Sequence, residues 1–448
     1  MNTIAFPGDE LTKLRQLLLG SSPEESAAIL VCGYWAQRST SKLLVRDIIP
    51  VPDQAYVRRS PSYLEIAPTF VARCLKKARQ DGLSLVFAHS HPLCDDVELS
   101  DVDTAGEERL MPVVFQRAPN RPHGTLVLGR MGFAGRIYRS ARRSLPLDRI
   151  VEVGRRLVLH DRQQTNVFVD PLFDRSVRAF GVQGQRVIRQ VRVGIVGLGG
   201  TGAVVAQQLA YLGVRDAVVI DSDVVEHSNL NRLVGATVRD IGRSKASVAR
   251  RAFTRLDTAN RVKAIVGTVL RSEDARNLLD RDIIFCCTDS HGSRAILNQL
   301  AYQYLIPVID MGARIDAVNG SVASVTGRVQ MLGPDNACLI CQSLLDSEVV
   351  RRELLSEEER AADPYIVGAP GEVQQPAVIS INTTVASLAV TMFLAAVAGL
   401  PSAARNQVYD GVAGRVRTVE VHASDSCVVC SLRGVFAKGE GWAMPWRN

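Results

Sequence analysis

Four of the chain's nine cysteines stand in two pairs with the same spacing. Cys338 and Cys341 form one Cys-x-x-Cys pair, and Cys427 and Cys430 form the other. A tetrahedral Zn²⁺ site needs four such thiolates, and a local pair lowers the entropy cost of assembling it. The 85 residues between the pairs exceed the spacing of a zinc ribbon, so the site would join distant segments. The pairs therefore predict one structural zinc site.

Two histidines and a carboxylate form a second group with metal-binding chemistry. His89 and His91 follow the apolar run LSLVFA, and Asp103 comes shortly afterwards. Alternate residues of a strand point to the same side, so both imidazoles would face a carboxylate in an open, catalytic Zn²⁺ site. The spacing leaves other third ligands open, namely Cys94, Asp95, Asp96 and Asp101.

A glycine-rich loop supplies a third kind of chemistry. Its glycines, in the stretch GLGGTG, are Gly197, Gly199, Gly200 and Gly202. The loop follows the apolar run VRVGIV and opens a helical pattern, so its backbone amides can approach phosphates at a helix N-terminus. Asp221 ends the next apolar run, 19 residues after Gly202, where a carboxylate can hold ribose hydroxyls. Taken alone, the loop predicts a nucleotide site with NAD as the default ligand.

The residues that follow this loop resemble the ThiF/MoeB family and the ubiquitin-activating enzymes. The segment from Asp221 to Arg232, DSDVVEHSNLNR, is similar to the family's D-x-D…SNLxRQ element. Lys245 follows thirteen residues after the arginine, as in the family. Leu233 replaces the family's glutamine, and we expect this loss of one polar group to matter little.

Two further motifs extend the resemblance to about Val169–Arg433. The CTD stretch that ends at Asp289 is similar to the family's turn after a later strand. Upstream, the FDR stretch that ends at Arg175, with AFGVQGQ after it, resembles the lead-in YDRQ…GxxGQ. The family uses this arginine as a finger that reaches across a homodimer in many relatives. The resemblance therefore implies a homodimer with Arg175 in that role.

The resemblance also implies a reaction, ATP-dependent adenylation of the C-terminal carboxylate of a ubiquitin-like or sulfur-carrier protein that ends in glycine. Asp221 would bind the ribose and Asp289 would hold Mg²⁺. The phosphates would be neutralised by Asn229, Arg232 and Lys245. Besides the four glycines, the implied nucleotide site consists of Asp221, Asp223, Asn229, Arg232, Lys245 and Asp289. Catalysis would rest on positioning and electrostatic stabilisation.

Relatives carry the same two cysteine pairs with a structural zinc, and ubiquitin-activating enzymes place a thioester-forming cysteine between them. This chain has no cysteine between Cys341 and Cys427. The cysteines outside the pairs are Cys32, Cys74, Cys94, Cys286 and Cys287. We therefore expect adenylation only, with the acyl-adenylate passed to a separate cysteine or sulfur donor.

The N-terminal histidines belong to a pattern that resembles the JAMM/MPN (JAB) metalloprotease motif, HSHP…SxxD. Here it consists of residues 89–92 and the stretch from Ser100 to Asp103, with one more residue between the two parts than is common. The resemblance covers residues 1–140. It implies a glutamate as general base, Glu25 or, in the alternative register, Glu24. Ser100 would stabilise the oxyanion.

The elements that position these residues divide the chain into regions. Residues 1–140 combine an amphipathic helix, Leu11–Leu19, with β-rich runs, as an α/β domain of the JAMM/MPN type would. Residues 141–168 are rich in arginine and predict a helical connector. Residues 169–436 alternate apolar β-runs with helical patterns, which predicts a doubly wound, Rossmann-like sheet. Residues 437–448 would form a tail.

Composition narrows the class of protein. The 448 residues are 46% hydrophobic and 22% charged, as in ordinary globular proteins. The net charge of +7 is spread over interrupted arginine stretches without interleaved aromatics, so we expect no nucleic-acid partner. The apolar run Pro376–Leu400 contains polar residues and predicts a buried helix, not a membrane span. The N-terminus lacks a signal-peptide pattern, and the paired cysteines favour a reducing cytoplasm.

These observations favour a bifunctional enzyme of a prokaryotic ubiquitin-like pathway. The N-terminal domain would cut a ubiquitin-like precursor or conjugate with a catalytic zinc, and the adenylating domain would activate the freed carboxylate with ATP and Mg²⁺. A conjugating-enzyme-like protein would be a further partner. The alternative is sulfur-carrier activation in cysteine, thiamine or molybdopterin synthesis. Two further hypotheses are an NAD-dependent oxidoreductase and a non-enzymatic binding scaffold.

Overall fold

The computed structural model describes residues 1–20, 22–95, 97–162, 170–362 and 376–447. Asp96 and residues 163–169, which figure in the predictions above, lie outside this set. The chain forms two compact units. Unit 1 comprises Met1–Asn166, Gln303–Leu305 and Ser431–Ala443, and unit 2 comprises Val167–Tyr302, Ile306–Cys430 and Met444–Asn448. Each unit has its own sheet.

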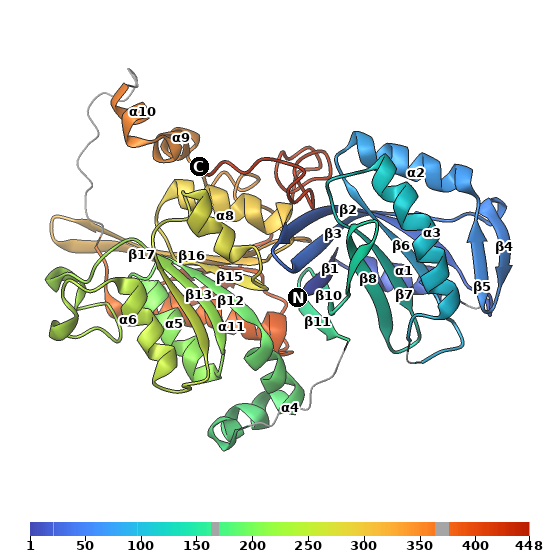
Figure 1. Cartoon of the computed structure of the whole chain (residues 1–448). Coiled ribbons are helices and arrows are strands. Elements are labelled where there is room, and N and C mark those ends of the chain that lie inside the picture. The colour runs from blue at the N-terminus through green and yellow to red at the C-terminus, as the bar shows by residue number, and fades with distance from the viewer. Residues whose placement is uncertain (21, 96, 163–169, 363–375, 448) are drawn as a thin grey trace. The chain divides into compact units, whose positions relative to one another are not determined.

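The sheet of unit 1 has nine strands in the order β11-β10-β1-β3-β2-β6-β7-β8-β9 (Figure 1). Helix α1 (Glu10–Leu18) packs on one face, and helices α2 (Pro68–Gln80) and α3 (Asp101–Arg117) cover the other. The strands are β1 (Asn2–Pro7), β2 (Ala27–Gln37), β3 (Thr40–Pro50), β6 (Ser84–Ser90), β7 (His123–Leu128), β8 (Phe133–Ser140), β9 (Arg143–Pro146), β10 (Arg149–Val153) and β11 (Leu157–Asp161). A separate hairpin consists of β4 (Tyr56–Ser60) and β5 (Tyr63–Ile66). The predicted first helix and β-rich runs are confirmed.

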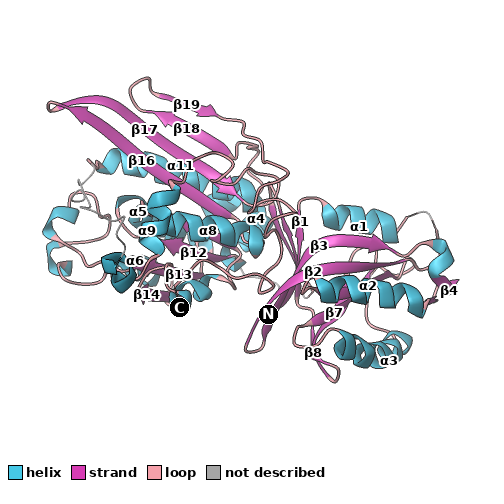
Figure 2. Ribbon diagram, turned by 90° about the horizontal axis from the view of Figure 1, so that it is seen from above, coloured by secondary structure: helices cyan, strands magenta, loops and turns pink. Residues whose placement is uncertain are grey.

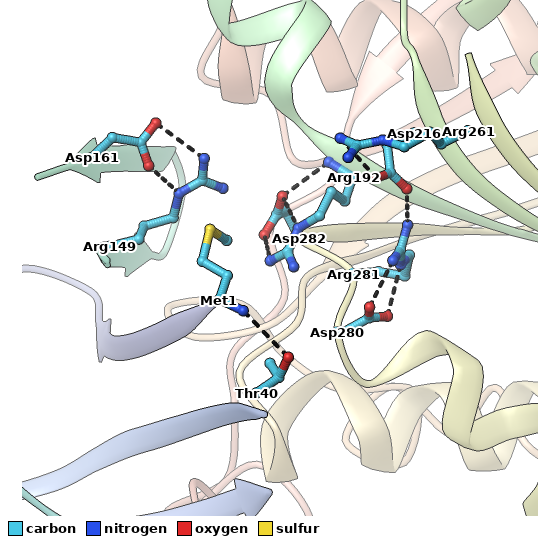
Figure 3. Close-up of polar contacts among 10 residues, drawn as sticks. All are labelled: Met1, Thr40, Arg149, Asp161, Arg192, Asp216, Arg261, Asp280, Arg281 and Asp282. Atoms are coloured by element: carbon cyan, nitrogen blue, oxygen red, sulfur yellow. Dashed lines mark hydrogen bonds and ion pairs between the residues drawn. The ribbon is translucent and has the colours of Figure 1, made fainter. Parts of the chain in front are cut away.

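The prediction of a helical connector over residues 141–168 is wrong for the described part of that segment. Strands β9, β10 and β11 occupy it, and β10 pairs in parallel with β1. Arginines suggested a helix, but Arg149 is a buried strand residue whose guanidinium is paired with Asp161 (Figure 3). Three of the five residues in RIVEV are β-branched, namely Ile150, Val151 and Val153, and this is the strand signal that the charges obscured.

Unit 2 confirms the doubly wound sheet. Its strand order is β14-β13-β12-β15-β16-β17-β18-β19, parallel from β14 to β16 and antiparallel beyond. Figure 2 shows the long β16–β17 hairpin. The strands are β12 (Arg192–Val196), β13 (Asp216–Asp221), β14 (Arg261–Val266), β15 (Ile283–Cys286), β16 (Val308–Val318), β17 (Ser321–Leu332), β18 (Asn406–Asp410) and β19 (Arg415–Thr418). Strand order reverses between β12 and β15, where such sheets bind ligands at their carboxyl edge.

The helices of unit 2 are α4 (Asp174–Gln190), α5 (Gly200–Leu212), α6 (Lys245–Thr254), α7 (Ser272–Ala275), α8 (His291–Gln303), α9 (Ser347–Leu354), α10 (Glu357–Ala362) and α11 (Ile379–Val397). Of these, α5 packs on β12, and α6 packs on β13 and β14. By length and composition, α11 is the one helix in the described residues that is apolar enough to cross a membrane. It packs on α5 and on β16 and β17, as expected of the buried helix predicted from this run.

Ion pairs fix the amino-terminal edge of the sheet in unit 2. Asp282 accepts hydrogen bonds from the guanidinium of Arg192 at 2.6 and 3.1 Å (Figure 3). Arg281 is paired with Asp216 and Asp280 (Figure 3). These residues lie at or just before the starts of β12, β13 and β15, so the pairs align three neighbouring strands. The opposite, carboxyl edge is left for ligands.

The C-terminal residues expected to end the adenylating domain and form a tail pack partly within unit 1. Glu440 donates its N–H to the carbonyl of Tyr34 at 2.7 Å, and Gly439 pairs with Tyr34 as an isolated parallel bridge. A Cβ on Gly33 would lie 2.1 Å from the carbonyl oxygen of Ala437, so only glycine permits this approach. The guanidinium of Arg46 donates to two carbonyls of the same segment.

Candidate active sites of the two units

The glycine-rich loop of unit 2 connects β12 to α5 at the carboxyl edge. Gly197 has φ +82°, and a Cβ there would lie 2.8 Å from the carbonyl oxygen of Cys287. A Cβ on Gly202 would lie 1.9 Å from the carbonyl oxygen of Gly197, so the turn requires both glycines. Beside Gly199 a Cβ would meet no atom within 4 Å, and no side chain caps α5. The helix N-terminus is thus open to an anion.

Asp221 lies beside this loop, at the end of β13. Its Oδ2 accepts the N–H of Leu198 at 2.5 Å, and its Oδ1 accepts the N–H of Asp223 at 2.8 Å. Burial raises the pKa of Asp221. The two amides fix the carboxyl group next to the glycine-rich loop, in the position where a carboxylate holds the ribose of a nucleotide.

Two predicted nucleotide ligands pair with each other. The ammonium of Lys245, the first residue of α6, lies 2.8 Å from a carboxylate oxygen of Asp223. The hydrogen bond from Lys245 lowers the pKa of Asp223. The Lys245 side chain is mostly buried and the Asp223 side chain is mostly exposed. The ion pair between them holds the ammonium of Lys245 near the carboxyl edge of the sheet.

The segment between these residues is held by local contacts. Arg232 donates to the carbonyl of Ser228 at 2.7 Å, and the side-chain oxygen of Asn229 accepts the N–H of Glu226 at 3.2 Å. Leu233, the departure from the family pattern, is buried in an apolar cluster with Val225 and Val248. A hydrophobic contact therefore stands where the family has a polar side chain.

Asp289 and Arg175 are both exposed in this single chain. Asp289 follows β15, and the preceding Thr288 carbonyl accepts a hydrogen bond from Arg294 at 3.1 Å. Arg175 lies in the first turn of α4, and no described contact joins it to the glycine-rich loop. The structure therefore brings together the loop, Asp221, Asp223 and Lys245, but not the proposed finger.

Sequence reasoning missed a buried polar group beneath this edge. Asp310 on β16 is fully buried and accepts hydrogen bonds from Arg328 at 3.2 Å and Gln330 at 3.1 Å. Arg294 lies 3.5 Å from the same carboxylate. No local spacing signals this group, because its members come from α8, β16 and β17 and meet only in the folded sheet.

Asn382 is a second residue that sequence reasoning did not assign to the site. A Cβ on Gly200 would lie 2.2 Å from its side-chain nitrogen, so the amide faces the start of α5. Asn382 is almost fully buried on the otherwise apolar α11. A lone amide in an apolar helix was the available signal.

The structure brings the four paired cysteines of unit 2 into one cluster. The sulfurs of Cys338 and Cys427 are 3.5 Å apart, those of Cys341 and Cys430 are 3.6 Å apart, and all four lie within 4.8 Å of one another. Four thiolates about 2.3 Å from a tetrahedral Zn²⁺ would be about 3.8 Å apart. Backbone amides, such as that of Ser424 to the sulfur of Cys341 at 3.4 Å, add hydrogen bonds to the thiolates. The donor set fits zinc.

In unit 1, the residues of the JAMM-like pattern converge at the end of β6. Nε2 of His89 lies 3.0 Å from one oxygen of Asp103, and Nε2 of His91 lies 3.5 Å from the other. Ligands about 2.05 Å from a tetrahedral Zn²⁺ would be about 3.3 Å apart, so this donor set also fits zinc. Burial opposes ionisation of Asp103, but hydrogen bonds to the two histidines outweigh it and hold its pKa below the usual range.

Glu25 completes the group from the start of β2. Its carboxylate lies 3.6 Å from Nε2 of His91 and is almost fully buried, and this burial raises its pKa. Arg59 on β4 holds the backbone here, donating to the Glu25 carbonyl at 2.7 Å. Glu24, the alternative base, is turned toward Arg59 at 3.6 Å and is half-exposed.

Ser100 forms hydrogen bonds with Asp103. It is the N-cap of α3, its hydroxyl donates to Oδ2 of Asp103 at 2.7 Å, and it accepts the N–H of Asp103 at 3.1 Å. This capping box aims the Asp103 carboxylate at the histidines. Of the alternative third ligands, Asp101, Cys94 and Asp95 are exposed, and none has a described side-chain contact with either imidazole; Cys94 meets His91 only through a backbone hydrogen bond, and Asp96 lies outside the described residues.

Comparison with known proteins bears on unit 2. A sequence profile of the ThiF family matches residues 173–429. The chain is 25% identical to the molybdopterin-synthase adenylyltransferase of Escherichia coli over 256 residues, 57% of this chain and 92% of that protein. It is 30% identical to the SAMP-activating enzyme E1 of Haloferax volcanii over 181 residues, 40% of this chain and 61% of that protein. The solved structure of E. coli MccB with MccA-N7isoASN aligns with 59% of this chain and 75% of that chain, at 18% identity and a TM-score of 0.48. Because the family profile spans more than half of the sequence, the chain belongs to the ThiF family, and it is an adenylyltransferase.

Proposed function

We propose that unit 2 uses ATP to adenylate the C-terminal carboxylate of a ubiquitin-like or sulfur-carrier protein that ends in glycine. The observation that carries this proposal is the convergence of an open helix N-terminus, Asp221 and Lys245 at the carboxyl edge, where the strand order reverses. The names of the relatives, a molybdopterin-synthase adenylyltransferase and a SAMP-activating enzyme, support this substrate class.

In this reaction a carboxylate oxygen attacks the α-phosphorus of ATP, pyrophosphate leaves, and an acyl-adenylate forms. The glycine-rich loop and the N-terminus of α5 bind the phosphates, and Asp221 holds the ribose. Lys245 exchanges its partner Asp223 for phosphate oxygens when ATP binds. Asp289 would hold Mg²⁺, which would supply positive charge to neutralise the polyphosphate. Arg175 acts from the second copy of a homodimer, in keeping with the lack of a described contact between Arg175 and the loop of its own chain.

The test is ATP–pyrophosphate exchange with the purified protein and carrier proteins that end in Gly-Gly. Exchange that depends on both the carrier and its free terminal carboxylate is expected. Lys245→Ala should abolish exchange, whereas Lys263→Ala, an exposed lysine on β14 that contacts Asn277, should not. Exchange without any carrier, or equal exchange by both variants, would contradict the proposal.

We further propose that unit 1 is a zinc-dependent peptidase or isopeptidase that processes the precursor or conjugates of the same carrier. The geometry of Glu25, His89, His91 and Asp103 supports this function. Zinc supplies Lewis-acid activation of water and of the scissile carbonyl when bound. Glu25 takes up the proton of the attacking water and returns it to the leaving amine. Ser100 keeps Asp103 aimed at the histidines and would stabilise the oxyanion.

Cleavage of a carrier extended beyond its terminal glycine tests this second proposal. Glu25→Gln should remove cleavage and keep the bound zinc, which atomic emission spectroscopy measures. Glu24→Gln is the matched control, since Glu24 faces Arg59 and not the histidines. Cleavage that survives Glu25→Gln at the wild-type rate would refute the assignment. If both proposals hold, units 1 and 2 act on the same end of one carrier protein, because cleavage by unit 1 releases the carboxylate that unit 2 adenylates.

The alternative is sulfur-carrier activation without conjugation. The absence of any cysteine between Cys341 and Cys427 favours it, because the chain then has no thioester nucleophile in that region. Incubation with ATP, the carrier and a conjugating-enzyme-like protein separates the two pathways. Thioester on the second protein supports conjugation, and thiocarboxylate alone supports sulfur transfer.

A further inference from the structure

A large cavity extends from the metal-binding group of unit 1. It has a volume of about 1020 Å³ and is lined at one end by Glu25, His89 and Asp103. Apolar residues of β5, α2 and α3 form much of the rest, among them Leu64, Val71, Leu75, Val102, Leu110 and Val113. Figure 1 shows α2 and α3 side by side in unit 1. The cavity thus joins an apolar surface to the predicted zinc ligands.

Most of the charged side chains that line the cavity and lack a partner of opposite charge are positive. Five exposed cations border the cavity, Arg73, Lys76 and Arg79 on α2 and Arg109 and Arg117 on α3. None of the five forms an ion pair within the described part of the chain. Glu107 is neutralised by Arg136 at 2.6 Å, and Glu25 and Asp103 lie against the histidines of the candidate metal site. Glu65 is therefore the remaining acidic side chain in the lining.

The hairpin strand β5 contributes an extended wall. All of its residues, Tyr63–Ile66, line the cavity, and β5 pairs only with β4 in the described sheet. An unpaired strand edge is a template for an extended segment, which gains main-chain hydrogen bonds while its side chains enter neighbouring pockets. Together with the apolar side chains of α2 and α3 that line the cavity, this strand edge favours an extended peptide over a compact ligand.

We infer that this cavity binds an extended peptide tail that carries carboxylate side chains along with apolar ones, and that the α2 and α3 cations select it. The inference rests on the peptidase function proposed above and names the substrate of that same site. The tail would run along β5 toward the metal-binding group. Its acidic side chains would meet Lys76, Arg79 and their neighbours, and uncharged or basic tails of the same shape would bind less tightly.

Binding can be measured apart from cleavage. Fluorescein-labelled peptides of one length and one apolar pattern, ending in Gly-Gly and carrying two glutamates, two glutamines or two lysines, are titrated against zinc-loaded full-length Glu25→Gln protein. Fluorescence anisotropy should give about tenfold tighter binding of the glutamate peptide than of the glutamine peptide, because each exposed ion pair contributes a few-fold. The lysine peptide should bind most weakly, and added salt should reduce the difference.

The helix α2 offers a matched control. Lys76→Gln with Arg79→Gln should abolish the preference for glutamate, whereas Lys77→Gln should keep it, since Lys77 is paired with Asp47 at 2.8 Å and does not line the cavity. Circular dichroism checks that the variants are folded. Equal binding of the three peptides, no binding of any, or an unchanged preference in the double variant would overturn the inference. So would displacement of the peptide by a single-stranded oligonucleotide at lower concentration.

The outcomes separate this inference from the peptidase proposal. If wild-type protein cleaves the extended carrier but the peptides show no charge preference, the inference is wrong and the peptidase proposal stands. If the preference is found but no zinc-dependent cleavage occurs, unit 1 is an acidic-tail binding module and the peptidase proposal is wrong.

Discussion

Lowering the pH should destabilise unit 1 through a single buried histidine. His123, the first residue of β7, is fully buried. Its Nδ1 accepts the N–H of Leu85 at 3.1 Å, and its Nε2 donates to the carbonyl of Ala118 at 2.9 Å. A protonated ring would turn Nδ1 into a donor that faces another donor. Leu85 belongs to β6, the strand that carries the candidate zinc ligand His89, so protonation would weaken the strand that positions this residue.

Burial lowers the pKa of His123 from 6.5 to about 4. As the pH falls, His123 is therefore protonated at a higher pH in the unfolded chain than in the folded chain. The stability that the neutral ring provides is complete above about pH 6.5, is lost between about pH 6.5 and 4, and amounts to about 3 kcal/mol at 1.36 kcal/mol per pH unit. By about pH 4.5 most of it, about 2.5 kcal/mol, should be gone.

Urea unfolding at about pH 7.5 and 4.5, followed by the fluorescence of the buried Trp35 on β2, measures this loss in unit 1. Trp442 and Trp446 are replaced by phenylalanine so that Trp35 alone reports. His123→Gln is the reference, because its amide keeps one acceptor and one donor but does not titrate. The wild-type background should lose about 2.5 kcal/mol more than the glutamine variant over this range. Equal losses would refute the reasoning.

Three further changes test unit 2. Gly202→Ala should lower the thermal midpoint and abolish ATP–pyrophosphate exchange, because its Cβ would lie 1.9 Å from the Gly197 carbonyl oxygen. A Cβ at Gly199 meets no atom within 4 Å, so Gly199→Ala should leave the thermal midpoint unchanged, and equal midpoints for the two variants would contradict this difference. Cys338→Ser should remove the bound zinc and lower the thermal midpoint, as metal analysis and calorimetry would show; a full zinc content would exclude the four-thiolate site. Leu233→Gln, which introduces the family's residue, should cost about 1–3 kcal/mol in urea unfolding, because the amide enters an apolar cluster; an unchanged midpoint would mean that the cluster opens to water.

Features whose chemistry is local in sequence were predictable. The glycine-rich loop, the paired cysteines and the His-x-His pattern each hold their partners within a few residues, and the helix–strand alternation after residue 169 gave the doubly wound sheet. Strands β9 to β11 were not predicted, because arginines in and between them hid a short run rich in β-branched residues. The Asp310 group was also missed, since α8, β16 and β17 converge only after the sheet forms.

The return of residues 431–443 to unit 1 sets an order of events during synthesis. Strand β2 pairs with β6 only as far as Cys32, and beyond that point Gly439 and Glu440 supply its backbone partner at Tyr34. Domains generally fold as they leave the ribosome, N-terminal first. Here the unit that is translated first cannot complete its fold until residues 431–443 have emerged. Every ribosome that stalls inside unit 2 therefore leaves an N-terminal unit with an unfinished strand edge.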